Sequence, residues 1–489
     1  MTTRVVSLAS AGGGYPSEAP FHPDEAFPEY GNRPVSDAPN HAYRAVRSAL
    51  AALGLDASHF GSPQWNPLGE LVRPGDRVFI KPNLVADGIR RACRQCNDLF
   101  AIITHPSVVR AVADYAAIAL RGSGEILIGD NPSIDCVFPR LLQATRLDSL
   151  PAVYREHFGV SSRVLDLRPV VCPDLRVYGI ASMMVPGPGD PLGVRVVDLG
   201  DDSFFAGMSP TLFRGVFTNR ATTMRAHTRG HRYAFSGTIL DADVYVSVPK
   251  LKTHHKVGAT LNVKGLVGTV ADKNGLPHWR IGFPSRGGDE FPPLPVQDKL
   301  LVALRHACTE WLPERMFQRL KTMTAGTQLE ILLHETRLTS GDYARGAWPG
   351  NDTCWRMAAD LYLAFVHRRV GTTRFLSVID GIVAGEGDGP FCPTPRDARV
   401  IVAGDDLLAT DFVAVRLMGL DREQVRYLPA LAARTGLQES DILVLRDGEP
   451  DEAFFAREDS YLTMKPPRAW SKLAIAPGRA RWRSRDGAS

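Results

Sequence analysis

A strand, an amphipathic helix and a second strand follow one another between residues 76 and 130. DRVFI at residues 76–80 and EILIGD at residues 125–130 are short runs rich in apolar and β-branched side chains. Between them, residues 107–120 (SVVRAVADYAAIAL) repeat apolar side chains at helical spacing. A helix that connects two neighbouring strands returns the chain to the same end of the sheet, so the strands pair in parallel. The pattern predicts an α/β fold with a mostly parallel sheet and helices on both faces.

Further apolar runs extend this pattern along the chain. Strands are predicted at residues 242–251, 374–382 and 398–404, and helices at residues 41–53 and in the stretch LLATDFVAVRLMGL after Asp405. The last two strands flank a Gly-rich segment, which is predicted to be a loop.

The length of 489 residues suits one large α/β domain with insertions, or two to three smaller units. Composition shifts along the chain suggest how it is divided. The expected parts are an irregular N-terminal lead-in at 1–40, a first part of the α/β core at 41–282, a loop and helical insertion at 283–350, a second part of the core at 351–450 and a basic C-terminal tail at 451–489.

Charge and cysteine content exclude several classes of protein. The 57 Lys and Arg nearly balance the 53 Asp and Glu, which argues against nucleic acid as the main partner. No run of 18 apolar residues is present, and the first residues lack the apolar core of a secretory signal. Seven scattered cysteines are not a disulfide framework. We expect a cytoplasmic protein without a transmembrane segment. The sequence does not decide between a monomer and a homo-oligomer.

Polar residues follow the first two predicted strands and begin the helix between them. Lys81 and Asn83 come directly after DRVFI, His105 lies at the head of the helix, and Asp130 and Asn131 end EILIGD. Ligands of open α/β sheets bind beyond the carboxyl ends of the strands, where these residues meet. All five are predicted to bind an anionic substrate. The alternatives are a solvated lysine, a helix cap and an Asx turn.

The densest polar cluster is PKLKTHHKVGATLNVKG at residues 249–265, with four Lys and two His. Crowded ammonium groups lower one another's pKa, so one lysine can serve as a base or nucleophile. Lys252, His254, His255 and Lys264 are predicted to be catalytic, although neighbouring residues of a strand point to opposite faces and at most one histidine is expected to join the site. The alternative is a solvated basic loop. Further residues predicted to bind substrate are Thr260, Asn262 and His278.

Carboxylates lie within the Gly-rich segment. Glu386 and Asp388 could hold a divalent cation, and Glu386 could serve as an acid or base opposite the Lys and His residues. We therefore predict Glu386 as catalytic and both carboxylates as metal ligands.

Two further features point to other chemistry. Cys93 and Cys96 form a CxxC motif without a second pair, which leaves two plain thiols, a redox pair or half of an intersubunit metal site as alternatives. The tail from Lys465 holds seven Lys and Arg, so it is either solvated or contacts an anionic surface.

Six motifs follow one another along the chain: KPN at 81–83, THPSVV at 104–109, GDNP at 129–132, VPKLKTHHKVGATLNVKGLVG at 248–268, IDGIVAGEGDGP at 379–390 and AGDDLLATD at 403–411. As a set, they resemble the family catalogued as domain of unknown function 362. The resemblance implies an α/β fold with one shared site. Many relatives carry ferredoxin-like CxxCxxC runs that this chain lacks, so an iron–sulfur cluster is not expected. A more distant likeness is to the nickel-dependent lactate racemase group, whose cofactor is not carried over because its motifs are not seen.

The leading hypothesis is a cytoplasmic enzyme that acts on a small anionic metabolite, a carboxylate or a phosphate. It would use Lys and His acid–base chemistry, with or without a divalent metal, as a lyase, isomerase or transferase rather than a hydrolase. The alternatives are a metal- or iron–sulfur-binding redox protein that uses Cys93 and Cys96, and a non-catalytic module that binds polyanions or glycans.

Overall fold

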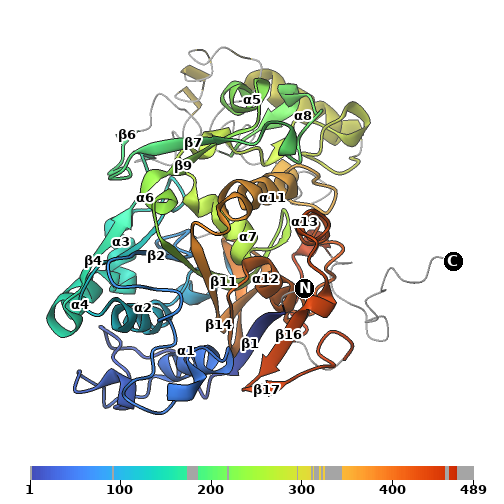
Figure 1. Ribbon diagram of the computed structural model, residues 1–489. Helices are drawn as coiled ribbons and strands as arrows, with labels where there is room; N and C mark the ends of the chain where they lie inside the picture. Colours follow the sequence, from blue (N-terminus) through green and yellow to red (C-terminus); the bar gives the residue numbers. More distant parts are fainter. Residues whose placement is uncertain are drawn as a thin grey trace.

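A large mixed sheet, in which most neighbouring strands are parallel, forms the centre of the computed structural model (Figure 1). Its strands are ordered β17-β16-β1-β15-β14-β10-β2-β3-β4. The predicted α/β fold with a mostly parallel sheet is confirmed. The structure describes residues 3–470 except for 91–92, 173–184, 217–219, 295, 310–311, 313–315, 317–318, 321–322, 325–343 and 458–461.

Five neighbouring strands of this sheet run in the same direction. On the other side of β14 the sheet becomes mixed, because β15 pairs antiparallel with both β14 and β1. The parallel strands are β14 (Arg374–Asp388), β10 (Val244–Val248), β2 (Arg77–Pro82), β3 (Glu125–Asp130) and β4 (Ser161–Asp166). The others are β15 (Cys392–Gly404), β1 (Arg4–Ser10), β16 (Ile442–Arg446) and β17 (Glu449–Pro450), with β11 (Lys250–His254) and β12 (Gly258–Ala259) beside the far end of β14.

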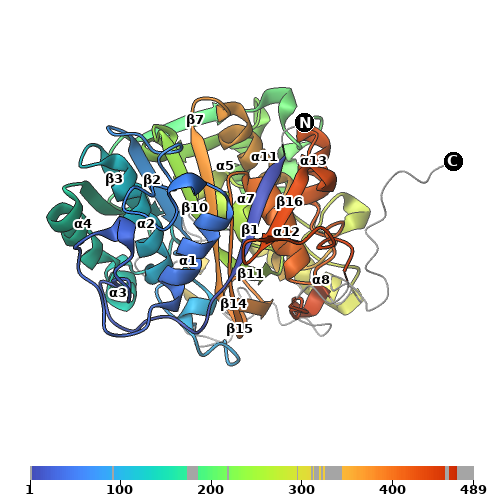
Figure 2. The ribbon, with the colours of Figure 1, turned by 60° about the horizontal axis from the view of Figure 1, so that its bottom comes forward.

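Alternating side chains divide the core between the two faces of the sheet. In β2, Val78 and Ile80 pack on one face, whereas Phe79 packs on the other. Helices cover both faces, and Figure 2 shows them on opposite sides of the central strands. The first face carries α1 (His41–Ala52), α2 (Pro106–Leu120) and α4 (Leu150–Phe158); the second carries α7 (Leu261–Gly265), α11 (Cys354–Phe365), α12 (Leu407–Leu417) and α13 (Tyr427–Thr435).

Smaller elements lie beyond the main sheet, and several form the upper part of Figure 1. There, β7 (Val194–Asp198) pairs with β9 (Arg232–Ser236) near α5 (Arg220–Thr228) and α8 (Val296–Thr309). The remaining elements are α3 (Phe138–Thr145), α6 (Gly237–Leu240), β5 (Val170–Val171), β6 (Val185–Pro186), β8 (Phe213–Arg214) and β13 (Trp279–Arg280).

The prediction of an irregular lead-in at 1–40 is wrong for its first part. Residues Arg4–Ser10 form β1, which lies between β15 and β16 inside the sheet. The run RVVSLAS is short but apolar, and Val6 and Leu8 are buried in the core. A strand at the end of a chain gives no helix or turn signal on one side, which hides it from pattern reading.

The Gly-rich segment at 385–390 is also not simply a loop, because β14 and β15 continue through it as one long hairpin up to the pair Asp388 and Cys392. Glycine is depleted in strands, but here it allows close packing. A Cβ atom at Gly385 would lie 2.5 Å from the backbone oxygen of Ala101. The hairpin therefore reaches far beyond the main sheet, alongside β11.

Parts of two predictions fall outside the described residues. The helices expected in the insertion at 283–350 begin with α8, but much of the stretch from 310 to 343 lies outside the described residues, as does the tail after Trp470. Among the described helices, none is both long enough and apolar enough to cross a membrane.

Candidate active site

The parallel strands β2 and β3 bring two of the predicted site residues together at their carboxyl ends. The Lys81 ammonium lies 3.0 Å from Oδ1 of Asp130, and both side chains are only 5% exposed. Oδ2 of Asp130 accepts a hydrogen bond from the backbone N–H of Leu84 at 2.8 Å. The two buried charges thus neutralise each other, and the hydrogen bond to Leu84 fixes the position of the segment that follows β2.

The segment that carries Lys264 packs directly onto this pair. A Cβ atom at Gly268 would lie 2.0 Å from Oδ1 of Asp130 and 2.6 Å from the Lys81 ammonium, so only glycine fits. The backbone and side-chain amides of Asn131 both donate to the oxygen of Gly268 at 3.0 Å. The motif VKGLVG therefore places α7 against the ends of β2 and β3.

Lys264 is the common member of a buried basic group that we call the lysine cluster. Its side chain is nearly buried, with 6% of the residue exposed, and among the described residues its ammonium has no hydrogen-bond or ion-pair partner. Burial lowers the pKa of Lys264. Its charge in turn acts on every other member. The lysine cluster consists of Lys252, His254, Lys256, Lys264, Lys273 and His278.

The other lysines of the cluster donate to backbone oxygens and not to carboxylates. Lys252 donates to Ile102 at 2.5 Å and to Pro390 at 3.2 Å. Lys273 donates to Pro132 at 2.7 Å and also to Asn131, and Lys256 donates to the oxygen of Arg345. Burial, the largest cause, lowers the pKa of Lys252 and of Lys273 to about 7 and that of Lys256 to about 8.

The buried histidines of the cluster are neutral and present different ring nitrogens. Burial and the Lys264 charge hold the pKa values of His254 and His278 well below the usual range. Nδ1 of His254 accepts the backbone N–H of Lys256 at 3.1 Å, which places the ring hydrogen on Nε2. Nδ1 of His278 lies 3.0 Å from the oxygen of Leu276 and must donate to it, which leaves Nε2 as an acceptor. One ring offers a hydrogen and the other a lone pair.

His255 lies beside His254, with ring centroids 5.2 Å apart, but its backbone serves another purpose. Its N–H donates to the oxygen of Gly389 at 2.9 Å, and its oxygen accepts from Nε1 of Trp470 at 2.6 Å. The ring is half-buried, and burial followed by the charges of Lys256 and Lys264 lowers its pKa to about 3.

A second buried group, which we call the Lys250–Asp380 pair, lies next to the cluster. The Lys250 ammonium is 2.9 Å from Oδ2 of Asp380, and both side chains are 0% exposed. The hydroxyl of Tyr15 lies 2.6 Å from both Oδ1 of Asp380 and the Lys250 ammonium. Sequence reasoning missed Tyr15, whose only signal was an aromatic side chain after three glycines.

The predicted substrate residue His105 belongs to this pair. Its backbone N–H donates to Oδ2 of Asp380 at 2.9 Å, and the Tyr15 ring stacks on its imidazole with 4.0 Å between centroids. Nδ1 of His105 accepts the backbone N–H of Ser107 at 3.1 Å and so caps α2. The structure thus gives His105 a capping and packing position.

The four predicted site residues with an amide or hydroxyl side chain differ in their environment. The side-chain amide of Asn262 donates to Oδ1 of Asp411 at 2.8 Å and ties α7 to α12. Asn83 donates its backbone N–H to the hydroxyl of Thr104 at 2.9 Å. The hydroxyl of Thr260 and Oδ1 of Asn131 are buried without a hydrogen-bond partner among the described residues, so each keeps a polar atom for a ligand.

The predicted metal ligands contact the C-terminal segment. Oε2 of Glu386 accepts the backbone N–H of Lys465 at 3.0 Å, and Oδ2 of Asp388 lies 2.6 Å from Nε of Arg468. Oε1 of Glu386 also lies 3.8 Å from the Lys465 ammonium, so both carboxylates face cations of the segment. No group of three or more His, Cys, Asp or Glu that could hold a metal ion occurs among the described residues.

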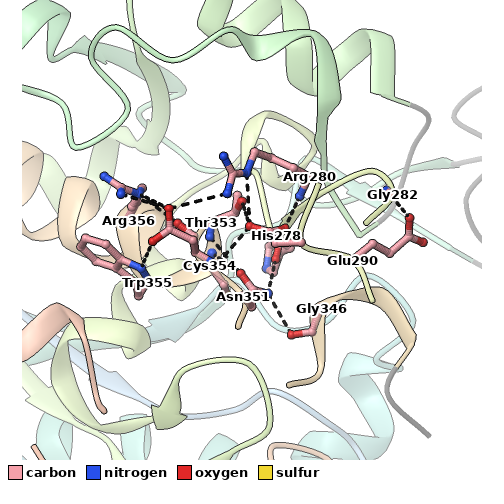
Figure 3. A network of polar contacts seen from close by, with 12 residues as sticks. His278, Arg280, Gly282, Glu290, Gly346, Asn351, Thr353, Cys354, Trp355 and Arg356 are labelled. Carbon is pink, nitrogen blue, oxygen red and sulfur yellow. Dashed lines mark hydrogen bonds and ion pairs between the residues drawn. The ribbon is translucent and has the colours of Figure 1, made fainter. Parts of the chain in front are cut away.

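A polar network holds His278 and its segment against the start of α11 (Figure 3). The side-chain amide of Asn351 donates to the oxygens of His278 and Gly346, each at 2.9 Å. Its Oδ1 accepts the backbone N–H of Cys354 at 2.9 Å. The hydroxyl of Thr353 donates to buried Asp289 at 2.5 Å. The network fixes the position of the His278 segment relative to the start of α11.

Cys93 forms a disulfide with Cys392 across 299 residues, whereas Cys96 is a free, buried thiol. The CxxC residues are therefore not paired with each other. This disulfide was not expected, because neither spacing nor compartment pointed to it. It joins the loop after β2 to the hairpin whose Pro390 oxygen accepts from Lys252.

Comparisons with known proteins support the sequence resemblance. The family model described as domain of unknown function (DUF362) matches residues 211–416, which confirms the resemblance over that stretch. The match includes β10, β11, α7 and β14, and residues 211–416 also contain every member of the lysine cluster. Over 370 residues the chain is 24% identical to a protein of Synechocystis sp. named a thylakoid-associated protein, covering 76% of this chain and 70% of that protein. No solved structure matches the chain significantly.

Proposed function

We propose, on the basis of the match to the domain of unknown function 362 family and the lysine cluster within it, that the chain is an enzyme acting on a small anionic metabolite. The observation that carries this proposal is the ammonium of the largely buried Lys264, which has no partner among the described residues. An isolated buried charge is costly for a fold unless a ligand compensates it. An anionic oxygen of the substrate would bind there.

The neutral histidines supply groups for proton transfer. Nε2 of His278 carries the lone pair that a general base needs, whereas Nε2 of His254 donates a hydrogen bond to a substrate oxygen. Lys252, with a pKa of about 7, can give or accept a proton near neutral pH. This combination suits an isomerase, lyase or transferase that removes a proton next to a carbonyl group.

The test is deuterium exchange with a panel of phosphorylated and carboxylated metabolites in D2O, followed by proton NMR. The wild-type protein is expected to exchange one C–H position of at least one panel member. His278→Asn should slow the exchange by about 10²-fold or more, the usual size of a general-base effect. Lys264→Gln should raise the concentration of metabolite needed for half-maximal exchange.

The matched control is Lys299→Gln, because Lys299 is an exposed lysine on α8. Its exchange rate should equal that of the wild type. Exchange that survives both His278→Asn and Lys264→Gln in folded protein, or no exchange with any panel member, would contradict the proposed function.

We also propose a cytoplasmic location. The name of the Synechocystis sp. relative raises association with a membrane surface as the alternative. Cell fractionation at low and high salt distinguishes the two, because attraction of the basic tail to an anionic surface is screened by salt. Recovery in the membrane fraction at both salt concentrations would contradict the cytoplasmic proposal.

A further inference from the structure

We infer that the group bound at Lys264 is a phosphate monoester, in which one tetrahedral group carries both negative charges. This inference rests on the proposed function and narrows its substrate class. Three observations support it: the excess of positive charge around Lys264, the lysine N–H donors that have no partner, and the fact that the cations are lysines.

Positive charge exceeds negative charge around Lys264. The other three lysines of the cluster all lie within electrostatic reach of Lys264, and none of the four forms an ion pair with a carboxylate among the described residues. The carboxylates that act on them are Asp130 and Glu290. Asp130 is already paired with Lys81, and Glu290 lies 2.8 Å from Nε2 of His306. A ligand with one negative charge would leave most of the excess in place.

Arg345 adds a further positive charge that acts on Lys256, and the remaining charged groups near the cluster do not change this balance. Arg168, which acts on Lys273, is held by Asp166 at 2.7 Å. Lys250, which acts on Lys252, is neutralised by Asp380. Burial raises the pKa of the Cys354 thiol, which is therefore uncharged near neutral pH.

The open donors also favour a tetrahedral group. An ammonium has three N–H donors, and all three of Lys264 are unused among the described residues. Lys252 and Lys273 each use two donors and Lys256 uses one, so each keeps at least one. These lysines come from β11, the turn after it, α7 and the segment after α7, and therefore approach from several directions.

The cations of the cluster are all lysines. A planar carboxylate is matched best by the parallel N–H donors of an arginine, whereas lysine acts as a point charge and is a common ligand of phosphate. The unpartnered hydroxyl of Thr260 adds a neutral donor of the kind that phosphate oxygens accept.

The experiment is calorimetric titration of the full chain at pH 8 with sulfate, malonate and acetate. Sulfate is a tetrahedral dianion whose charge does not change at this pH, so any proton taken up comes to the protein. Malonate is a dicarboxylate and acetate a monocarboxylate. Two buffers with different heats of ionisation measure the proton uptake.

We expect sulfate to bind at least about tenfold more tightly than malonate or acetate, as charge-assisted hydrogen bonds to a matched dianion require. Binding should take up about one proton per sulfate, because an anion raises the lowered pKa values of the cluster lysines. Lys264→Gln and Lys273→Gln should each weaken sulfate binding, and Lys299→Gln should not.

Each other result contradicts a defined part of the account. Malonate or acetate binding as tightly as sulfate would overturn the phosphate assignment and leave the proposed function standing. Sulfate binding without proton uptake in the wild type, a result that needs no variant, would also overturn the assignment. No binding of any of the three anions would overturn the proposed function as well, as would binding unchanged in a folded Lys264→Gln variant.

Discussion

Lys250 and Lys264 are both buried at the same rim of the sheet, but the protein treats their charges differently. The Lys250 ammonium is paired with Asp380 at 2.9 Å and also contacts Tyr15. The Lys264 ammonium has no partner among the described residues. A buried charge that is paired on all sides serves the fold, whereas a buried charge left open is available to a ligand.

The Lys250–Asp380 pair connects segments far apart in the chain. Asp380 lies on β14, Lys250 on β11 and Tyr15 in the N-terminal segment, and the backbone of His105 leads into α2. The lysine cluster faces the 278–290 segment and the start of α11. The Lys250–Asp380 pair therefore holds these segments together at the edge of the sheet. The lysine cluster beside it keeps N–H donors that are available to a ligand.

The largest difference is expected from replacing each lysine by Met. Lys250→Met leaves Asp380 buried without a counter-charge and should lower the free energy of unfolding by about 3–5 kcal/mol. Lys264→Met removes a charge that has no partner and should leave the free energy of unfolding unchanged or raise it. Urea unfolding followed by circular dichroism measures both. An equal decrease in the free energy of unfolding in both variants would contradict the proposed difference between the two lysines.

Removing the disulfide should give the next largest loss of stability. This change tests whether the covalent link between the loop after β2 and the β14–β15 hairpin, which surround Lys252, stabilises the fold. Cys93→Ser should lower the free energy of unfolding by about 2–5 kcal/mol, because the cross-link closes a long loop. Cys96→Ala, which removes a free thiol of the same loop, should cost less. Unfolding with and without dithiothreitol provides the measurement. Free thiols at Cys93 and Cys392 in the oxidised protein, found by mass spectrometry, would contradict this expectation.

Gly268 tests the contact between α7 and the Lys81–Asp130 pair. Gly268→Ala places a methyl group against both charged side chains and should cost about 1–3 kcal/mol of stability. Gly265→Ala is the matched control, since a Cβ atom there would meet nothing within 4 Å and the backbone is helical. That control should be neutral or stabilising by up to about 1 kcal/mol. A neutral Gly268→Ala would mean that α7 does not rest on this pair.

The last expected effect is a rise of stability with pH that the lysine cluster should produce. The pKa values of Lys252 and Lys273 are lowered to about 7, so above pH 7 the unfolded chain binds more protons than the folded chain. The free energy of unfolding therefore rises with pH between 7 and 8.5, by at most about 1.4 kcal/mol per pH unit for each group. Lys252→Met and Lys273→Met should each flatten the rise. A flat profile in the wild type would contradict the lowered pKa values.

Sequence patterns predicted which residues lie at the carboxyl ends of the parallel strands, but they did not predict which of these residues contact one another. DRVFI, EILIGD and VYVSV are apolar runs long enough to predict parallel strands, and the order of the chain then places Lys81, Asp130 and Lys252 at one edge. Which charges meet could not be predicted, because pairing depends on tertiary packing. Tyr15 and Lys250 are 235 residues apart, and the disulfide spans 299.

Glu386 and Asp388 illustrate the same limit. Their glycine-rich surroundings predicted a loop facing the basic residues, but the hairpin continues and directs both carboxylates to Lys465 and Arg468. Glycine lowers the intrinsic preference for strands, while here the close approach to Ala101 and Thr253 decides the local structure.

The most direct test of the account is a crystal structure of the protein soaked in selenate, a tetrahedral dianion with an anomalous signal. The account predicts an anomalous peak beside Lys264, with a selenate oxygen within hydrogen-bond distance of its Nζ atom. Absence of a peak there in crystals that bind selenate elsewhere, or a carboxylate side chain paired with Lys264, would contradict the claim that this lysine is kept open for an anion.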